Sequence, residues 1–164
     1  MSDNYAVING KRVELTDTQL KALGIKERKN PFERAAKGEP YCYIDAFDRI
    51  QTFVDNREDA DNTSFEASNY FNDKTTAQQV RLHQLLYRKL LKFAYDNGCE
   101  DTAEWNGVNK HWLIGWSCDT GDFIIFNEYD YKGQEVYFSS KEVAERAIKD
   151  VVEPFMKDHP EFIW

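Results

Sequence analysis

One strand-to-helix junction occurs twice in this chain, and it constrains the fold more than any other feature. Residues 70–80 (YFNDKTTAQQV) are echoed by residues 137–147 (YFSSKEVAERA), with Tyr, Phe, Lys and Ala in the same register. In both copies the aromatic end of a predicted strand runs through a helix cap into an amphipathic helix. The pattern therefore predicts a duplicated unit in which strands are followed by a helix.

Residues 1–25 predict a small hairpin followed by a short helix. Two short strands flank Asn9-Gly10, which is the strongest two-residue hairpin signal because both turn residues must accept positive φ. Thr16 and Gln19 are spaced as a capping box at the start of the helix. Residues 26–40 are polar and contain two prolines, so we expect a linker there.

The first large unit, residues 41–98, is predicted to contain three strands and a long helix. We interpret the acidic residues 55–64 as a solvated loop without apolar anchors. The helix from about Asp73 to Asn97 carries apolar residues at helical spacing and would be roughly 37 Å long, so we expect both units to share it. The strands are expected at residues 41–44, 49–54 and 65–71.

The second large unit, residues 99–164, repeats this plan. Ser139 is expected to cap the final helix in a capping box with Glu142, and Pro154 to end or kink it because proline lacks an N–H. The apolar residues 160–164 are expected to dock on the body. The strands are expected at residues 110–117, 123–127 and 135–138.

The expected fold class is α+β with antiparallel sheets. We expect tandem βββα repeats that share one long helix and that follow a small ββα unit at the N-terminus.

Charge and cysteine content narrow the function. The chain has 21 Lys and Arg against 29 Asp and Glu, a net charge of −8. This balance opposes binding to a phosphate backbone and fits a basic protein partner or a soluble surface.

The three cysteines are widely spaced without a CxxC pair, so we expect reduced thiols and a cytosolic compartment. Neither a signal peptide nor a membrane-spanning stretch is apparent in the sequence, and we expect no membrane partner.

No motif for catalysis or for a cofactor stands out. The chain lacks a Gly-rich phosphate loop, a GxSxG elbow and an HExxH pair, and residues 55–61 lack the ligand pattern of a calcium-binding loop. We therefore expect no catalytic residues, no metal and no cofactor. An enzyme of unknown class stays an alternative, and it would need a cleft that gathers His83 or His111 with carboxylates.

Two sets of residues are candidates for binding a partner protein. Trp112 and Trp116 share one face of a predicted strand, where they either pack in the core or form exposed hot spots. The other set consists of acids in predicted loops and turns: Asp55, Glu58, Asp59, Asp61, Asp119 and Asp122.

A nucleic-acid-binding module is a further alternative. Its positive surface would come from one cluster on the long helix: Arg81, Arg88, Lys89 and Lys92.

The Phe-x-x-Lys-x-x-Ala string at each junction, in residues 70–77 and 137–144, resembles the arm-type DNA-binding domain of phage integrases. That resemblance implies a three-stranded sheet that enters the major groove. The charge is opposite, because residues 41–71 contain seven acids against two arginines. A sheet that reads DNA would not carry this balance.

The whole chain resembles small uncharacterised proteins of phages and prophages of Gram-positive bacteria. The likeness lies in three segments: INGKRVELTDTQLKALGI, NPFERAAKGEPYCYID and YFSSKEVAERAI…PEFIW. That group has no assigned activity, but small acidic phage proteins include inhibitors of bacterial defence such as anti-CRISPR proteins. We therefore expect a non-enzymatic phage or prophage accessory protein, monomeric or homodimeric, in the cytoplasm of a bacterial host. Its acidic loops would occlude the basic groove of a bacterial protein such as a nucleic-acid-handling defence nuclease.

Overall fold

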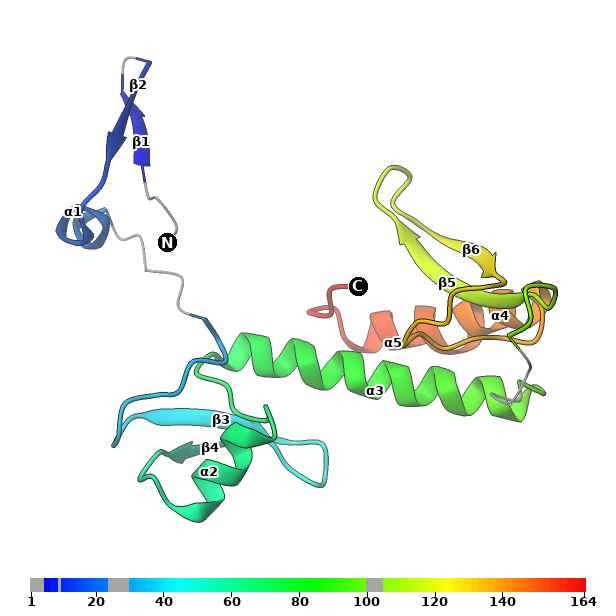
Figure 1. The fold of residues 1–164 in the computed structure, drawn as a ribbon, viewed down its shortest axis with the longest axis horizontal. Helices are drawn as coiled ribbons and strands as arrows, with labels where there is room; N and C mark the ends of the chain where they lie inside the picture. The colour runs from blue at the N-terminus through cyan, green and yellow to red at the C-terminus, as the bar shows by residue number, and fades with distance from the viewer. Residues whose placement is uncertain (1–4, 9, 24–29, 100–104) are drawn as a thin grey trace.

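The computed structural model of the chain describes residues 5–8, 10–23, 30–99 and 105–164 (Figure 1). Strands pair into three two-stranded antiparallel sheets in these residues, so the fold is α+β as predicted. The elements are β1 (Tyr5–Ile8), β2 (Lys11–Glu14), α1 (Asp17–Ala22), β3 (Pro40–Ile44), β4 (Ile50–Val54), α2 (Asp59–Glu66), α3 (Lys74–Asp96), β5 (His111–Ser117), β6 (Asp122–Glu128), α4 (Lys141–Ala147), the π-helical segment η1 (Ile148–Val152) and α5 (Glu153–Asp158).

The N-terminal unit forms as predicted. β1 pairs with β2 in an antiparallel hairpin whose turn includes Gly10 at a φ of 75°, whereas Asn9 lies outside the described residues. The Thr16 N–H donates to Gln19 Oε1 at 2.9 Å and the Gln19 N–H donates to Thr16 Oγ1 at 3.4 Å, which confirms the capping box. Of the predicted linker, residues 24–29 also lie outside the described residues.

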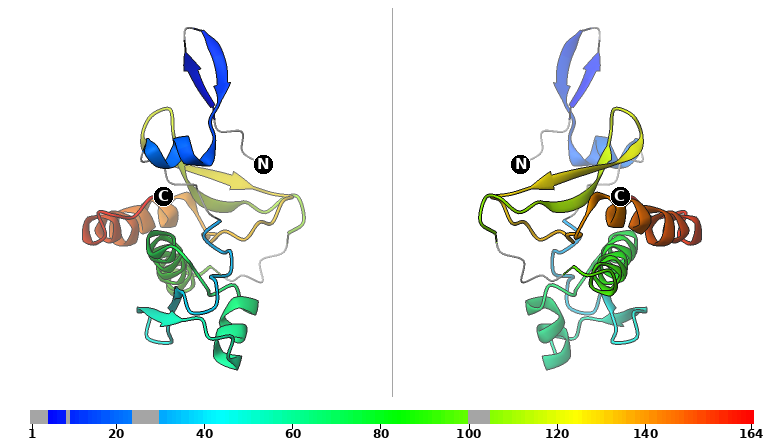
Figure 2. Two further views of the ribbon diagram at one scale, coloured as in Figure 1. Left: turned by 90° about the vertical axis from the view of Figure 1, so that its left-hand side faces the viewer. Right: turned by 90° about the vertical axis from the view of Figure 1, so that its right-hand side faces the viewer.

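The long helix α3 lies between two parts of the molecule (Figures 1 and 2). β3 and β4 contact α3 on one side, and α4 and η1 contact it on the other. The Asp73 carboxylate accepts a 2.7 Å bond from Thr76 N–H and caps the helix start. Gly98, at a φ of 79°, follows the helix end. The helix is long, as predicted, and it packs against both parts of the molecule.

In the part of the chain that the structure describes, the core consists of two clusters of buried apolar residues, and α3 contributes to both. The smaller one joins Cys42, Phe71 and Ala77 under the β3–β4 hairpin. The larger one contains Leu82, Leu86, Leu90 and Ala94 of α3 together with Val136, Phe138, Val143, Ala144, Ala147, Val152, Phe155 and Phe162.

The third strand of each predicted sheet is wrong. Only Phe71 of residues 65–71 pairs with the β3–β4 hairpin, by a single bridge to Cys42. In the second unit only Phe138 pairs, by a single bridge to Trp112. Each sheet therefore has two strands, and one phenylalanine extends it.

The prediction of a solvated loop at residues 55–64 is also wrong, because α2 begins within it. The Asp61 carboxylate accepts hydrogen bonds from the N–H groups of Asn56 and Glu58, at 2.9 and 3.0 Å. These bonds satisfy N–H groups at and just before the helix start, so Asp61 stabilises the start of α2.

The final helix starts one residue later than predicted. Ser140, not Ser139, accepts the capping bond from Val143 N–H. Ahead of Pro154 the helix becomes a π turn, η1, and then continues as α5 with the proline in its first turn. A π turn is wider than an α-helical turn, so the carbonyls of the turn before Pro154 lie farther from the proline ring. The helix therefore changes its geometry at the proline and continues.

Residues 159–164 dock on the body, as predicted. The Gln79 side chain donates to the carbonyl of Glu161 at 2.7 Å and accepts from Ile163 N–H at 3.0 Å. Phe162 is buried in the larger cluster. One glutamine of α3 thus holds the backbone of the C-terminal segment.

Among the helices that the structure describes, none combines the length and the apolar character needed to cross a membrane.

Candidate functional site

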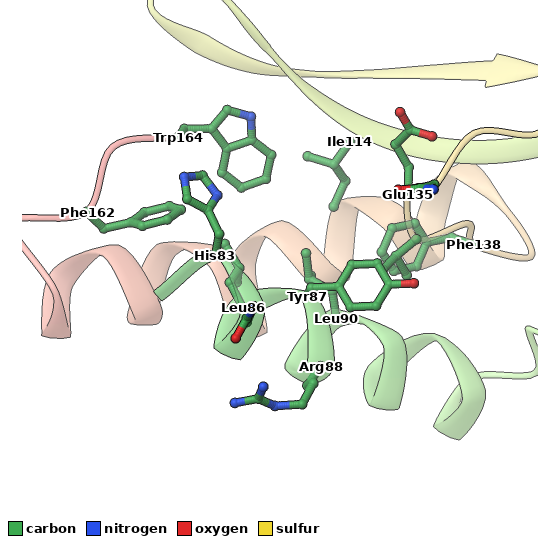
Figure 3. Close-up of a pocket in the computed structure, with 13 residues that line it drawn as sticks. His83, Leu86, Tyr87, Arg88, Leu90, Ile114, Glu135, Phe138, Phe162 and Trp164 are labelled. Atoms are coloured by element: carbon green, nitrogen blue, oxygen red, sulfur yellow. The ribbon is translucent and has the colours of Figure 1, made fainter. Parts of the chain in front are cut away.

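An apolar cleft of about 550 Å³ lies between α3, β5 and residues 159–164 (Figure 3). Leu86 and Leu90 of α3 line one side. Ile114 of β5 and Trp164 of the C-terminal segment line the opposite side. Tyr87 stands at the cleft and is 43% exposed. Residues 134–138 complete the lining, so four separate segments enclose this apolar hollow.

The apolar periodicity of α3 and the docked C-terminal segment build this cleft. Leu82, Leu86 and Leu90 are four residues apart, so they share the face of α3 that meets the larger cluster. The Trp164 ring packs edge-on against Phe123, with centroids 5.0 Å apart. The C-terminal wall of the cleft is therefore aromatic, and the contact with Phe123 holds the Trp164 ring against β6.

The polar groups at the cleft are widely separated. His83 packs edge-on against the Phe162 ring, with centroids 4.8 Å apart. Glu135 lies at the other end of the cleft from His83 (Figure 3). Arg88 points away from the cleft and donates to Asp48 Oδ1 at 2.7 Å. Within the described residues, no group of three or more His, Cys, Asp and Glu is placed to hold a metal ion.

Two of the acids predicted to bind a partner are buried, so that part of the prediction is wrong. Asp55 has no exposed surface, and Asp61 is buried as well. Asp55 Oδ2 accepts bonds from Arg34 Nε at 2.9 Å, from Tyr70 OH at 2.9 Å and from Arg57 Nη1 at 3.1 Å. The Asp55 carboxylate is therefore used within the fold, where a partner cannot reach it.

The surroundings of both buried acids favour the ionised form. The hydrogen bond from Arg34 lowers the pKa of Asp55 to about 2, against the opposing effect of burial. Burial would raise the pKa of Asp61, but bonds from Glu58 N–H and Tyr41 OH outweigh it and hold that pKa below its ordinary value. Both acids thus contribute to the stability of the fold at neutral pH.

We expect stability to fall as the pH drops from about 4 to about 2. Unfolded Asp55 binds a proton near its ordinary pKa of 3.8, whereas the folded pKa is about 2. Its stabilisation is complete above the unfolded pKa and is lost as the pH falls through the folded one. Urea unfolding at several acidic pH values measures the effect. A variant with Asp55→Asn should lose less stability over this range than the wild type, and equal losses would contradict the assignment.

The four remaining acids are exposed, but they do not form one patch. Glu58 and Asp59 lie at the start of α2, whereas Asp119 and Asp122 lie at the β5–β6 turn. α2 and this turn are on opposite sides of α3 (Figures 1 and 2). A single partner surface would contact one pair or the other.

The two candidate tryptophans differ in burial. Trp112 packs against the larger cluster, and Lys110 Nζ lies 5.7 Å from the centroid of its ring. Trp116 packs edge-on against Phe123 and is partly exposed. Trp112 is therefore partly buried against the core, whereas the Trp116 side chain is exposed to solvent.

The two arginines of the alternative nucleic-acid surface share one acidic partner within the fold. Arg81 and Arg88 both form ion pairs with Asp48, at 3.0 and 2.7 Å.

The lysines of that surface have acidic neighbours. Lys92 pairs with Asp96, and Lys89 lines a groove of about 300 Å³ that also contains Asp96, Asp150 and Asp158. The helix does not present the unopposed positive surface that phosphate binding requires.

Sequence reasoning missed the cleft. The apolar character of residues 160–164 was the available signal. However, contacts between Gln79 and Ile163 join positions 84 residues apart, and no local pattern specifies them.

The chain matches no protein-family model, and neither the curated proteins nor the solved structures contain a significant match to it.

Proposed function

We propose that this is a non-enzymatic binding protein that receives an apolar anchor of a partner protein in the cleft. The observation that carries this function is the cleft itself, an apolar hollow of about 550 Å³ with Tyr87 and Trp164 at its edges. Aromatic residues around a hollow are typical of sites that dominate binding energy. His83 and Glu135 lie at opposite ends, which favours binding over acid–base chemistry.

The partner in this proposal is a bacterial protein with a basic surface, such as a defence nuclease, and the protein acts as a phage or prophage inhibitor. The net charge of −8 would attract such a surface and accelerate the encounter. Asp119 and Asp122 are the predicted acids that remain exposed on the same side of α3 as the cleft. Occlusion would therefore use this side of the molecule.

We also propose that the two hairpin-to-helix units arose by duplication. In each, a phenylalanine that directly follows a tyrosine bridges the first strand of the preceding hairpin: Phe71 to Cys42 and Phe138 to Trp112. A capped helix begins three residues later in both cases, at Lys74 and Lys141. This correspondence supports a common origin for the two units.

A charged residue in place of Tyr87 at the cleft should weaken the binding of apolar ligands. In the variant Tyr87→Glu the carboxylate would need to be desolvated when an apolar group enters, so we expect binding at least about tenfold weaker. The measurement is the fluorescence increase of the neutral dye Nile red on titration with protein, followed by co-purification of partners from a bacterial lysate.

Tyr95→Glu provides the matched control. Tyr95 lies on the same helix two turns away, is 54% exposed and does not line the cleft. We expect this variant to bind the dye and to recover partners like the wild type. If both variants bind equally well, the cleft is not the binding site. If the dye signal is lost while the recovered proteins stay the same, partners bind elsewhere on the surface.

A further inference from the structure

Among the described residues, no strand pairs with the outer edge of β6. In the β5–β6 hairpin, β6 is the strand farther from α3 (Figures 1 and 2). The other edge of this sheet, on β5, carries the bridge between Trp112 and Phe138. A strand edge with unpaired N–H and C=O groups is a template for pairing with another chain.

The register identifies which backbone groups of β6 point outward. Trp112 exchanges both of its backbone hydrogen bonds with Phe138, so its N–H and C=O point away from β6. Trp112 lies opposite Asn127, so the backbone groups of Asn127 point away from β5. By alternation the same holds for Ile125 and Phe123. No described residue forms a backbone hydrogen bond with these outward groups.

One face of β6, here called the outer face, carries acidic and apolar side chains in a defined order. Asp122, Ile124, Phe126 and Glu128 occupy every second position and therefore share one face. Ile124 is 44% exposed and Phe126 is 39% exposed. Beside them on β5 is Gly115, at which a Cβ would come within 2.8 Å of the Phe126 ring. The outer face thus presents two apolar residues between two acids.

We propose that the β6 edge binds an extended segment of a partner protein by strand addition. The segment would carry a basic residue, two apolar residues and a second basic residue at alternate positions. The outward N–H and C=O groups would supply the backbone hydrogen bonds, and the side chains of the segment would match the order along β6. This surface is separate from the apolar cleft, so the inference does not depend on the proposed function.

The same acids disfavour a second copy of this chain as the occupant. If β6 paired antiparallel with β6 of another molecule over its full length, Asp122 of each copy would lie opposite Glu128 of the other. Like charges directly opposite one another destabilise a strand pair. A partner with basic residues at those positions converts both contacts into favourable ones.

A synthetic peptide tests this inference on the full-length protein. The probe is acetyl-Lys-Thr-Val-Thr-Val-Thr-Lys-amide, and the control peptide carries Glu in place of both Lys. We expect the basic peptide to bind about tenfold more tightly at low salt, with the difference shrinking as salt is added. By NMR, hydrogen exchange should slow at the N–H groups of Phe123, Ile125 and Asn127. It should change little at Ile124 and Phe126, whose N–H groups already face β5.

Charge reversal supplies the matched variants. Asp122→Lys with Glu128→Lys should weaken binding of the basic peptide by about fivefold or more. Glu39→Lys with Glu66→Lys, the same change in net charge at exposed residues elsewhere, should have a smaller effect. Equal effects of the two double variants would overturn the proposal, as would peptide contacts confined to the cleft or no binding at millimolar peptide. A concentration-dependent dimer that protects the same three amides would show that a second copy is the occupant instead.

Discussion

Replacing Asp55 with asparagine is expected to destabilise the protein by about 3 kcal/mol. Removing one member of a buried ion pair costs roughly 3–5 kcal/mol because the other charge loses its partner. Arg34 and Arg57 retain 24% and 36% of their side-chain surface, so water partly compensates for the loss. The lower end of that range therefore applies. Urea unfolding followed by circular dichroism measures the change in the free energy of unfolding.

Asp119→Asn is the control for this result. Asp119 is exposed at the β5–β6 turn, and surface substitutions of this kind change stability by about 0.5 kcal/mol or less. If the two variants were equally stable, the Asp55 network would contribute nothing, and the burial of an acid there would need another explanation.

Truncating either junction phenylalanine, as Phe71→Ala or Phe138→Ala, should cost about 3–5 kcal/mol in the free energy of unfolding. Both side chains are almost completely buried. Phe71 belongs to the smaller core cluster and Phe138 to the larger one. Alanine would remove the ring contacts and leave a cavity that the surrounding helices and strands fill only in part. Thermal and urea unfolding would both report the loss.

Phe47→Ala is the control, because it tests whether the loss of any aromatic ring lowers the free energy of unfolding to the same extent. Phe47 lies in the exposed β3–β4 turn, where its ring faces the Arg49 guanidinium at 5.0 Å. We expect a change of about 0.5–1 kcal/mol, as for an exposed cation–π contact. A comparable loss at Phe47 and Phe138 would contradict the role assigned to the junctions.

The fold could be predicted where the signals are local. Asn9-Gly10 and the Thr16 capping box each act within a few residues, and the hairpin strands and the helix next to them form as expected. The predicted third strands failed because aromatic and β-branched content does not reveal whether a partner strand is present. At residues 65–71 only Phe65 and Glu66 belong to α2, and only Phe71 bridges to β3.

The candidate site was harder to predict because its residues come from distant positions. The acidity of residues 55–61 suggested a solvated surface, whereas Asp55 is paired with Arg34, 21 residues earlier in the chain. A carboxylate in an acidic segment looks the same in the sequence whether it is exposed or paired. The hollow near Tyr87 likewise depends on where residues 159–164 dock, which the sequence indicates only by their apolar character.

The central position of α3 has a consequence for folding cooperativity. Ala77 packs in the smaller cluster and Leu82 to Ala94 in the larger one, so the two clusters share one continuous hydrogen-bonded helix. Because both clusters pack on this one helix, we expect the parts on both sides of α3 to unfold cooperatively, so that opening of one part lowers the free energy needed to open the other.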